Sequence, residues 1–105
     1  IVRQVRQHLL QNQIETITVV DLCQRFAISR RTLQYAFQDV MGMSPNAYLR
    51  TIRLNGVRRC LRDPNSGVGS VQAAAADWGF WHLSQFARDY RELFGELPSE
   101  RLKRR

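Results

Sequence analysis

Apolar residues recur along most of this chain every three or four positions, the spacing that places them on one face of an α-helix. Turn-forming residues interrupt this spacing at Gly42, at 63–69, at Gly79 and at 95–98. No segment shows the strict alternation of a strand. The pattern therefore predicts an all-α protein of about seven helices, over residues 2–11, 19–26, 30–41, 45–62, 71–78 and 82–94 and from 98 onward.

The same pattern predicts which side chains form the core. In the helix over 30–41 we expect four residues to face inward: Leu33, Ala36, Phe37 and Val40. In the helix over 45–62 we expect six: Tyr48, Leu49, Ile52, Val57, Cys60 and Leu61. Hydroxyl residues that favour helix N-termini precede four of the helices: Thr18, Ser29, Ser44 and Ser70.

Two of the connections between helices are unusually short, at 27–29 and at 79–81. Such turns are typical of the helix-turn-helix. The apolar positions before the first turn recur 52 residues later, and those after it recur 53 residues later, so the second turn is expected to be one residue longer. We therefore expect two duplicated helix-turn-helix units, over about 18–41 and 70–94, joined by a linker helix over about 45–62. Two unrelated helical hairpins with similar core spacing are the alternative.

Composition adds a strong positive charge to this picture. The 105 residues have a net charge of +7, and every basic residue except Lys103 is arginine. Arginine forms forked hydrogen bonds with phosphate and guanine, whereas lysine acts as a point charge. The charge favours a nucleic-acid partner, although a solvated basic surface would look the same. A chain of this length is one small domain, or two very small ones on a shared scaffold.

Other function classes find little support. The cysteines and histidines (Cys23, Cys60, His8, His82) stand alone, without the spacing of metal ligands. No nucleophile–base pair, paired carboxylates or phosphate-binding glycine loop is present, so we expect no enzyme, no metal and no cofactor. No apolar run is long enough to span a membrane. The isolated cysteines favour a cytoplasmic protein, and the abrupt helical start suggests a fragment of a longer chain.

The second helix of a helix-turn-helix enters the major groove of DNA. Polar side chains facing away from the core are then candidates for base contacts, because arginine pairs with guanine and glutamine with adenine. An outward Leu83 would suit a thymine methyl; alternatively, it belongs to the core. The candidates for base contacts are Arg30, Arg31, Gln34, Tyr35, Gln38, Leu83, Ser84, Gln85 and Arg88.

A second set of residues is expected to contact phosphates: Ser29, Arg50, Arg53, Arg62, His82 and Arg91. A solvated arginine face is the alternative for the arginines of the linker helix. That helix would be about 27 Å long. With the flanking units added, the two recognition helices would lie roughly one turn of DNA apart, about 34 Å.

These residues form a recognisable signature. The second half contains Gly79-Phe80-x-x-x-Ser84-x-Phe86-x-Arg88-x-Tyr90-Arg91-x-x-x-Gly95-x-x-Pro98, and the first half contains Ser29-x-Arg31-Thr32-Leu33-Gln34-x-x-Phe37 and Gly42-x-Ser44-Pro45-x-x-Tyr48. The chain thereby resembles the C-terminal DNA-binding half of AraC/XylS-type transcription regulators. Three positions depart from the family pattern: Tyr35 replaces a frequent arginine, Trp78 a smaller aliphatic residue, and Trp81-His82 a small polar cap.

The resemblance implies double-stranded DNA with an asymmetric site as a partner, together with RNA polymerase. Within the family, the sequence is most similar to regulators of ethanolamine utilisation. This implies an activator of a catabolic operon, with ethanolamine and adenosylcobalamin as effectors sensed by an N-terminal domain outside this chain. The alternatives are a helical protein-interaction module that contacts RNA polymerase or another regulator, and RNA binding, which the lack of a strand-borne aromatic platform disfavours.

Overall fold

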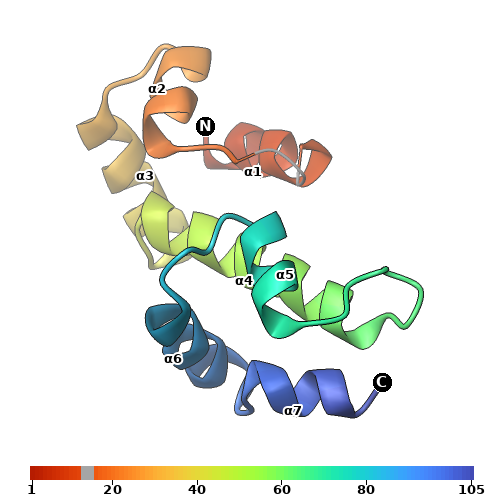
Figure 1. Cartoon of the computed structure of the whole chain (residues 1–105). Helices are drawn as coiled ribbons and strands as arrows, with labels where there is room; N and C mark the ends of the chain where they lie inside the picture. The colour runs from red at the N-terminus through yellow and green to blue at the C-terminus, as the bar shows by residue number, and fades with distance from the viewer. Residues whose placement is uncertain (13–15) are drawn as a thin grey trace. The chain divides into compact units, whose positions relative to one another are not determined.

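The computed structural model describes residues 1–12 and 16–105, and the regular secondary structure of these residues is entirely α-helical. The helices are α1 (Val2–Gln11), α2 (Val19–Phe26), α3 (Arg30–Met41), α4 (Pro45–Arg62), α5 (Val71–Asp77), α6 (Leu83–Phe94) and α7 (Pro98–Lys103) (Figure 1). The all-α, seven-helix prediction is confirmed for these residues. The chain divides into two compact units, Ile1–Ile52 and Arg53–Arg105, and α4 carries residues of both.

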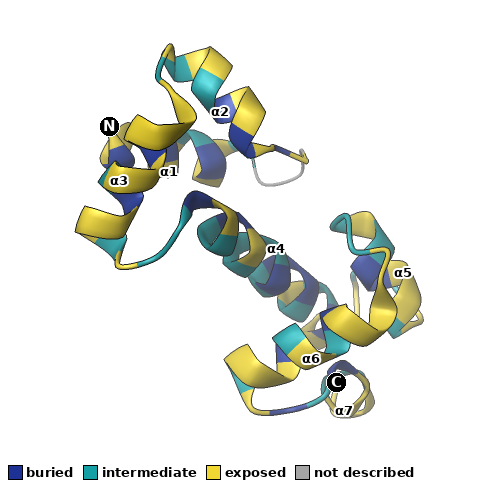
Figure 2. Ribbon diagram, turned by 90° about the vertical axis from the view of Figure 1, so that its left-hand side faces the viewer, coloured by how far each residue is buried: buried dark blue, intermediate teal, exposed yellow. Residues whose placement is uncertain are grey.

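The first unit buries one face of α3 against α1 and α2 (Figure 2). Leu33 and Phe37 are fully buried there, as the sequence predicts, but the prediction for Val40 is wrong: its side chain is 64% exposed. Successive residues of an α-helix are about 100° apart around its axis, so a residue four positions on is displaced by only about 40° around the helix. The buried face runs from Leu33 through Phe37 to Met41, which packs against this core and leaves Val40 at its edge.

The linker helix α4 serves two cores in succession. Its first half contributes Leu49 to the core of the first unit, and its second half contributes Val57 and Leu61 to the core of the second. Leu54 is also buried, although the sequence analysis did not place it inward. A single inward stripe cannot describe a helix whose two halves pack against different partners, which explains the omission.

The backbone of the two turns repeats at the predicted offsets. Ala27 and Gly79, 52 residues apart, both adopt left-handed conformations, with φ of 52° and 83°. The next residue donates a backbone hydrogen bond to an equivalent carbonyl in each case, Ile28 to Cys23 at 3.1 Å and Phe80 to Ala75 at 2.9 Å. The extra residue of the second turn therefore lies between Phe80 and the start of α6.

The N-caps of the following helices, Ser29 and His82, lie 53 residues apart. The second connection is longer than the predicted 79–81, because α5 ends at Asp77 and α6 begins at Leu83. Serine caps α3 through its side chain, which accepts from the backbone N–H of Thr32 at 3.1 Å. His82 makes no such side-chain bond, and only its backbone carbonyl takes part, accepting from the N–H of Phe86 at 2.9 Å.

The second unit contains a close approach of α4 to the end of α5. The ring of Trp78 lies directly over Gly56, so closely that a Cβ atom at this position would be 2.5 Å from three ring carbons. The indole Nε1–H donates to Sγ of Cys60 at 3.4 Å. Ala74 and Ala75 are fully buried beside these residues. Small residues on α4 and α5 thus accommodate the large Trp78 side chain.

Candidate nucleic-acid interface

The outward face of α3 carries five of the nine side chains expected to contact bases. All five are exposed: Arg30, Arg31, Gln34, Tyr35 and Gln38. The buried Leu33 and Phe37 fix the rotation of the helix, so its polar residues lie together on the opposite side. The structure thus brings this half of the predicted set together, within the first unit.

Arg31 is held by an aromatic neighbour one turn along α3. Its Nε–H donates to the hydroxyl of Tyr35 at 3.1 Å, and its guanidinium carbon lies 5.3 Å from the centre of that ring. Tyr35 therefore orients an arginine that can form a forked contact with guanine. This gives a physical role to one of the departures from the family pattern.

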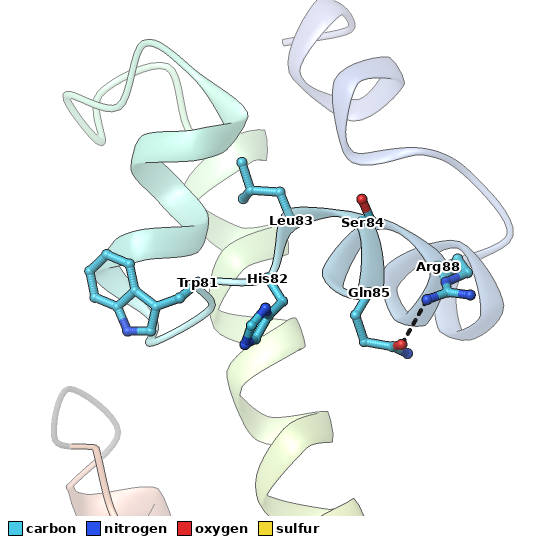
Figure 3. Close-up of a pocket in the computed structure, with 6 residues that line it drawn as sticks. All are labelled: Trp81, His82, Leu83, Ser84, Gln85 and Arg88. Carbon is cyan, nitrogen blue, oxygen red and sulfur yellow. Dashed lines mark hydrogen bonds between the residues drawn. The ribbon is translucent and has the colours of Figure 1, made fainter.

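The outward face of α6 carries the remaining candidates for base contacts: Leu83, Ser84, Gln85 and Arg88. All four are exposed and line one open pocket together with Trp81 and His82 (Figure 3). Leu83 is 41% exposed, which agrees with its outward assignment and not with a place in the core. The buried Phe86 and Tyr90 hold the opposite side of the helix.

Trp81 is a surface residue that the sequence analysis did not include among the site candidates. Its side chain is 76% exposed and lines the same pocket as His82 and Arg88. Two signals pointed to it: it lies in the longer second turn, and it replaces a small polar residue of the family pattern. A large apolar side chain in such a position offers a surface for apolar contact beside the start of α6.

Hydrogen bonds on α6 link three polar side chains. Arg88 Nη2 donates to Gln85 Oε1 at 2.9 Å, and Gln85 Nε2 donates to Asp89 Oδ1 at 2.9 Å. The first of these bonds is visible in Figure 3. Two candidates for base contacts are thus oriented before any DNA is present.

The candidates for phosphate contacts are less uniform. Five are exposed and Arg53 is half-buried; the exposed ones are Ser29, Arg50, Arg62, His82 and Arg91. Two other arginines of α4 pack on aromatic rings: the guanidinium of Arg58 lies 4.8 Å from the centre of Phe94, and that of Arg59 lies 5.7 Å from Trp78. Some of the arginines of α4 therefore contribute to packing within the second unit.

An acidic residue joins the end of α6 to α7. Glu96 is only 8% exposed, and its carboxylate accepts from Arg101 at 2.7 and 3.1 Å and from Arg104 at 3.1 Å. The hydrogen bonds from Arg101 hold the pKa of Glu96 below its ordinary value, against the opposing effect of burial. This cluster links the segment that follows α6 to α7 and its C-terminal end.

The described helices contain none long and apolar enough to cross a membrane.

Comparison with known proteins gives the chain a family. The family described as "Helix-turn-helix domain" matches residues 22–104. The chain is 38% identical over 99 residues to the "XylDLEGF operon transcriptional activator" of Pseudomonas putida, covering 94% of this chain and 31% of that protein. It is 33% identical over 103 residues to the "Probable thc operon regulatory protein" of Rhodococcus erythropolis, covering 98% and 31%. The chain thus spans about a third of the length of these relatives.

Solved structures agree with the sequence relatives. The crystal structure of a probable AraC family transcriptional regulator from Rhodopseudomonas palustris CGA009 matches with a TM-score of 0.89 and 42% identity, covering 98% of this chain and 94% of that one. A transcriptional regulator with an AraC-type DNA-binding domain, from Chromobacterium violaceum, matches with a TM-score of 0.75 and 27% identity over 85% of this chain and 77% of that one. This chain belongs to the AraC family of helix-turn-helix transcription regulators, and not to a family of enzymes.

Proposed function

We propose that the chain binds double-stranded DNA in a sequence-specific manner, with α3 and α6 as recognition helices in successive major grooves. The proposed domain occupies the whole chain, with helix-turn-helix units over about 18–41 and 70–94 and a linker helix over about 45–62. The observation that carries the proposal is the pair of duplicated helices whose core sides are alike and whose outward sides differ.

The two outward faces offer different chemistry, so the proposed site is asymmetric. On α3 an arginine is oriented by Tyr35, whereas α6 presents an exposed leucine followed by Gln85 and Arg88. Arginine suits guanine, glutamine suits adenine, and leucine suits the thymine methyl. A symmetric pair of half-sites would require two similar faces, which this chain does not have.

The regulatory role follows from the relatives. Several of them are named as operon transcriptional activators, which supports the role of a transcriptional activator. A catabolic operon, a contact with RNA polymerase and a place in the bacterial cytoplasm, associated with the nucleoid, are predictions of the sequence resemblance alone. The names of the relatives given above do not mention ethanolamine, so they lend no support to that operon or to its effectors. An effector sensed by a further domain, with ethanolamine and adenosylcobalamin as the specific case, stays a prediction of the sequence resemblance.

Two substitutions separate base contacts from phosphate contacts. Arg88→Ala removes a side chain expected to pair with a base, so it should weaken binding to the selected site by about 1–3 kcal/mol and relax the preference at one base pair. The measurement is a fluorescence-anisotropy titration against the selected site and against random DNA. An equal loss on both would contradict base recognition by Arg88.

Arg62→Ala is the matched test for a phosphate contact. Arg62 is exposed in the last turn of α4, and its loss should weaken binding to all sequences alike. It should also lower the slope of log affinity against log salt by about one unit. A slope that stays the same would show that Arg62 lies away from the DNA backbone.

A second candidate function is a protein contact, for example with RNA polymerase. Val40 and Leu93 occupy equivalent positions of α3 and α6, 53 residues apart, and are 64% and 45% exposed. Single exposed apolar residues are common on protein surfaces, so it is their recurrence at equivalent positions that favours a protein contact. If they serve this function, Val40→Ser and Leu93→Ser will lower transcription activation without lowering DNA affinity. Activation that is unchanged in both variants would rule this candidate out.

A further inference from the structure

The most informative feature outside the base-contact set is the carboxylate of Asp89 on α6. Asp89 accepts from Gln85 Nε2 at 2.9 Å, while Gln85 Oε1 accepts from Arg88 Nη2 at 2.9 Å. Gln85 lies three residues before Arg88 and four before Asp89, the two spacings that bring side chains together on one helix face. The amide of Gln85 is therefore held at both of its ends.

Chemistry permits only one orientation of this amide. A guanidinium has hydrogen-bond donors alone, and an ionised carboxylate has acceptors alone. The oxygen of Gln85 must therefore face Arg88, and its nitrogen must face Asp89. An amide turned by 180° would set donor against donor and acceptor against acceptor.

The fixed amide retains the groups needed to recognise a base. One N–H and one oxygen lone pair of Gln85 remain after the two bonds, and recognition of adenine in the major groove uses one donor and one acceptor. The order in which Gln85 presents them depends on Asp89. In the free protein these exposed bonds contribute little to stability, but their strength rises where bound DNA excludes water.

We propose that Asp89 is a positioning residue for base recognition by the second unit: it fixes the Gln85 amide and, through it, the Arg88 guanidinium. This proposal rests on the proposed function, because it assigns a role within the same DNA interface. The proposed role of Asp89 is exerted through Gln85 and requires no contact between its carboxylate and the DNA, whose phosphates repel a negative charge.

The first unit orients its arginine by a different means. The position equivalent to Asp89, 53 residues earlier, is Ala36, and Arg31 is held by the hydroxyl and ring of Tyr35. Substitution of Asp89 should therefore affect only the part of the DNA site that α6 recognises. The bases recognised by α3 provide an internal control in the same experiment.

The test is a double-mutant cycle in DNA binding. Affinities for the selected site and for random DNA are measured for the unsubstituted chain, Asp89→Asn, Gln85→Ala and the double variant. The asparagine side chain can donate as well as accept, so it removes the constraint with little change of shape. Glu92→Gln is the matched control, because Glu92 is an exposed acid on the same helix.

Asp89→Asn should lower the ratio of selected-site to random-DNA affinity about fivefold, the equivalent of about 1 kcal/mol for one hydrogen bond. In the Gln85→Ala background the same substitution should not change the ratio, because coupled residues are non-additive. Glu92→Gln should also leave the ratio unchanged, and Asp89→Glu, which keeps an acceptor alone, should restore part of the preference.

A second measurement tests the geometry without DNA. The side-chain amide signals of Gln85 in a ¹⁵N–¹H spectrum should move in the Asp89→Asn variant and stay in place in the Glu92→Gln variant. The role of Asp89 is overturned, and the proposed function is left intact, if Asp89→Asn does not change the ratio of selected-site to random-DNA affinity. It is likewise overturned if Asp89→Asn lowers this ratio equally in the Gln85→Ala background. An unsubstituted chain that binds all DNA equally overturns the proposed function, and this proposal with it.

Discussion

Gly56 allows the sharpest test of how the second unit is built. A Cβ atom at this position would lie 2.5 Å from three carbons of the Trp78 ring, far inside van der Waals contact. The ring cannot bend, and its movement would disturb the bond from Nε1 to Cys60 and the stacking of Arg59. Because Trp78 immediately precedes the turn before the recognition helix, we expect Gly56→Ala to destabilise the second unit.

The magnitude follows from two opposing terms. Overpacking of a well-packed site costs about 1–3 kcal/mol, and the rigid ring places this case near the upper limit. Alanine in a helix interior is more favourable than glycine by about 1 kcal/mol, which offsets part of this cost. Gly56→Ala should therefore lower the free energy of unfolding by about 2 kcal/mol. Urea denaturation followed by circular dichroism measures this difference.

Two further variants make the result specific to Trp78. In a Trp78→Leu background, Gly56→Ala should be neutral or stabilising by up to about 1 kcal/mol, because only the helix-propensity gain remains. Gly69→Ala is the control, because a Cβ atom at Gly69 would meet nothing within 4 Å. The same loss from Gly56→Ala with and without Trp78 would refute the close contact as its cause.

Two more predictions concern the turn of the first unit and the end of the second. Ala27 has φ of 52° where the equivalent Gly79 has no Cβ atom, so Ala27→Gly should raise the free energy of unfolding by about 0.5–1 kcal/mol, and a lower stability would contradict this. Glu96→Gln should lower Tm at pH 7, where the lowered pKa of the folded state favours the carboxylate. The difference in Tm between the two proteins should shrink as the pH falls from 4.5, the ordinary pKa of a glutamate, through the lower pKa of Glu96 in the folded state. Equal Tm differences at pH 7 and pH 3 would contradict the role of the ion pairs.

Much of the fold is predictable because its determinants are local. Thr18, Ser29 and Ser70 cap their helices as expected, and Thr18 does so in a capping box with Asp21, with bonds of 2.9 and 3.2 Å. The helix spacing also identifies which side of α3 and α6 carries polar groups. These features depend on residues only a few positions apart, so the chain sequence contains them directly.

Other features depend on contacts that spacing does not specify. Val40 and Leu54 were misplaced because their burial depends on which helix packs opposite, and not on the residues beside them. The close approach of Trp78 to Gly56 joins residues 22 positions apart. The link from Asp89 through Gln85 to Arg88 has helical spacing, but glutamine and aspartate recur on exposed faces without any such role.

Selection of bound duplexes from a random DNA pool tests the central claim most directly. We predict that each recovered site contains two dissimilar sequence blocks, about one helical turn apart. Selection with Arg31→Ala should blur one block, and selection with Arg88→Ala should blur the other. A single block, a symmetric pair of blocks, or a pool without enrichment would contradict the account of two different recognition helices in one chain.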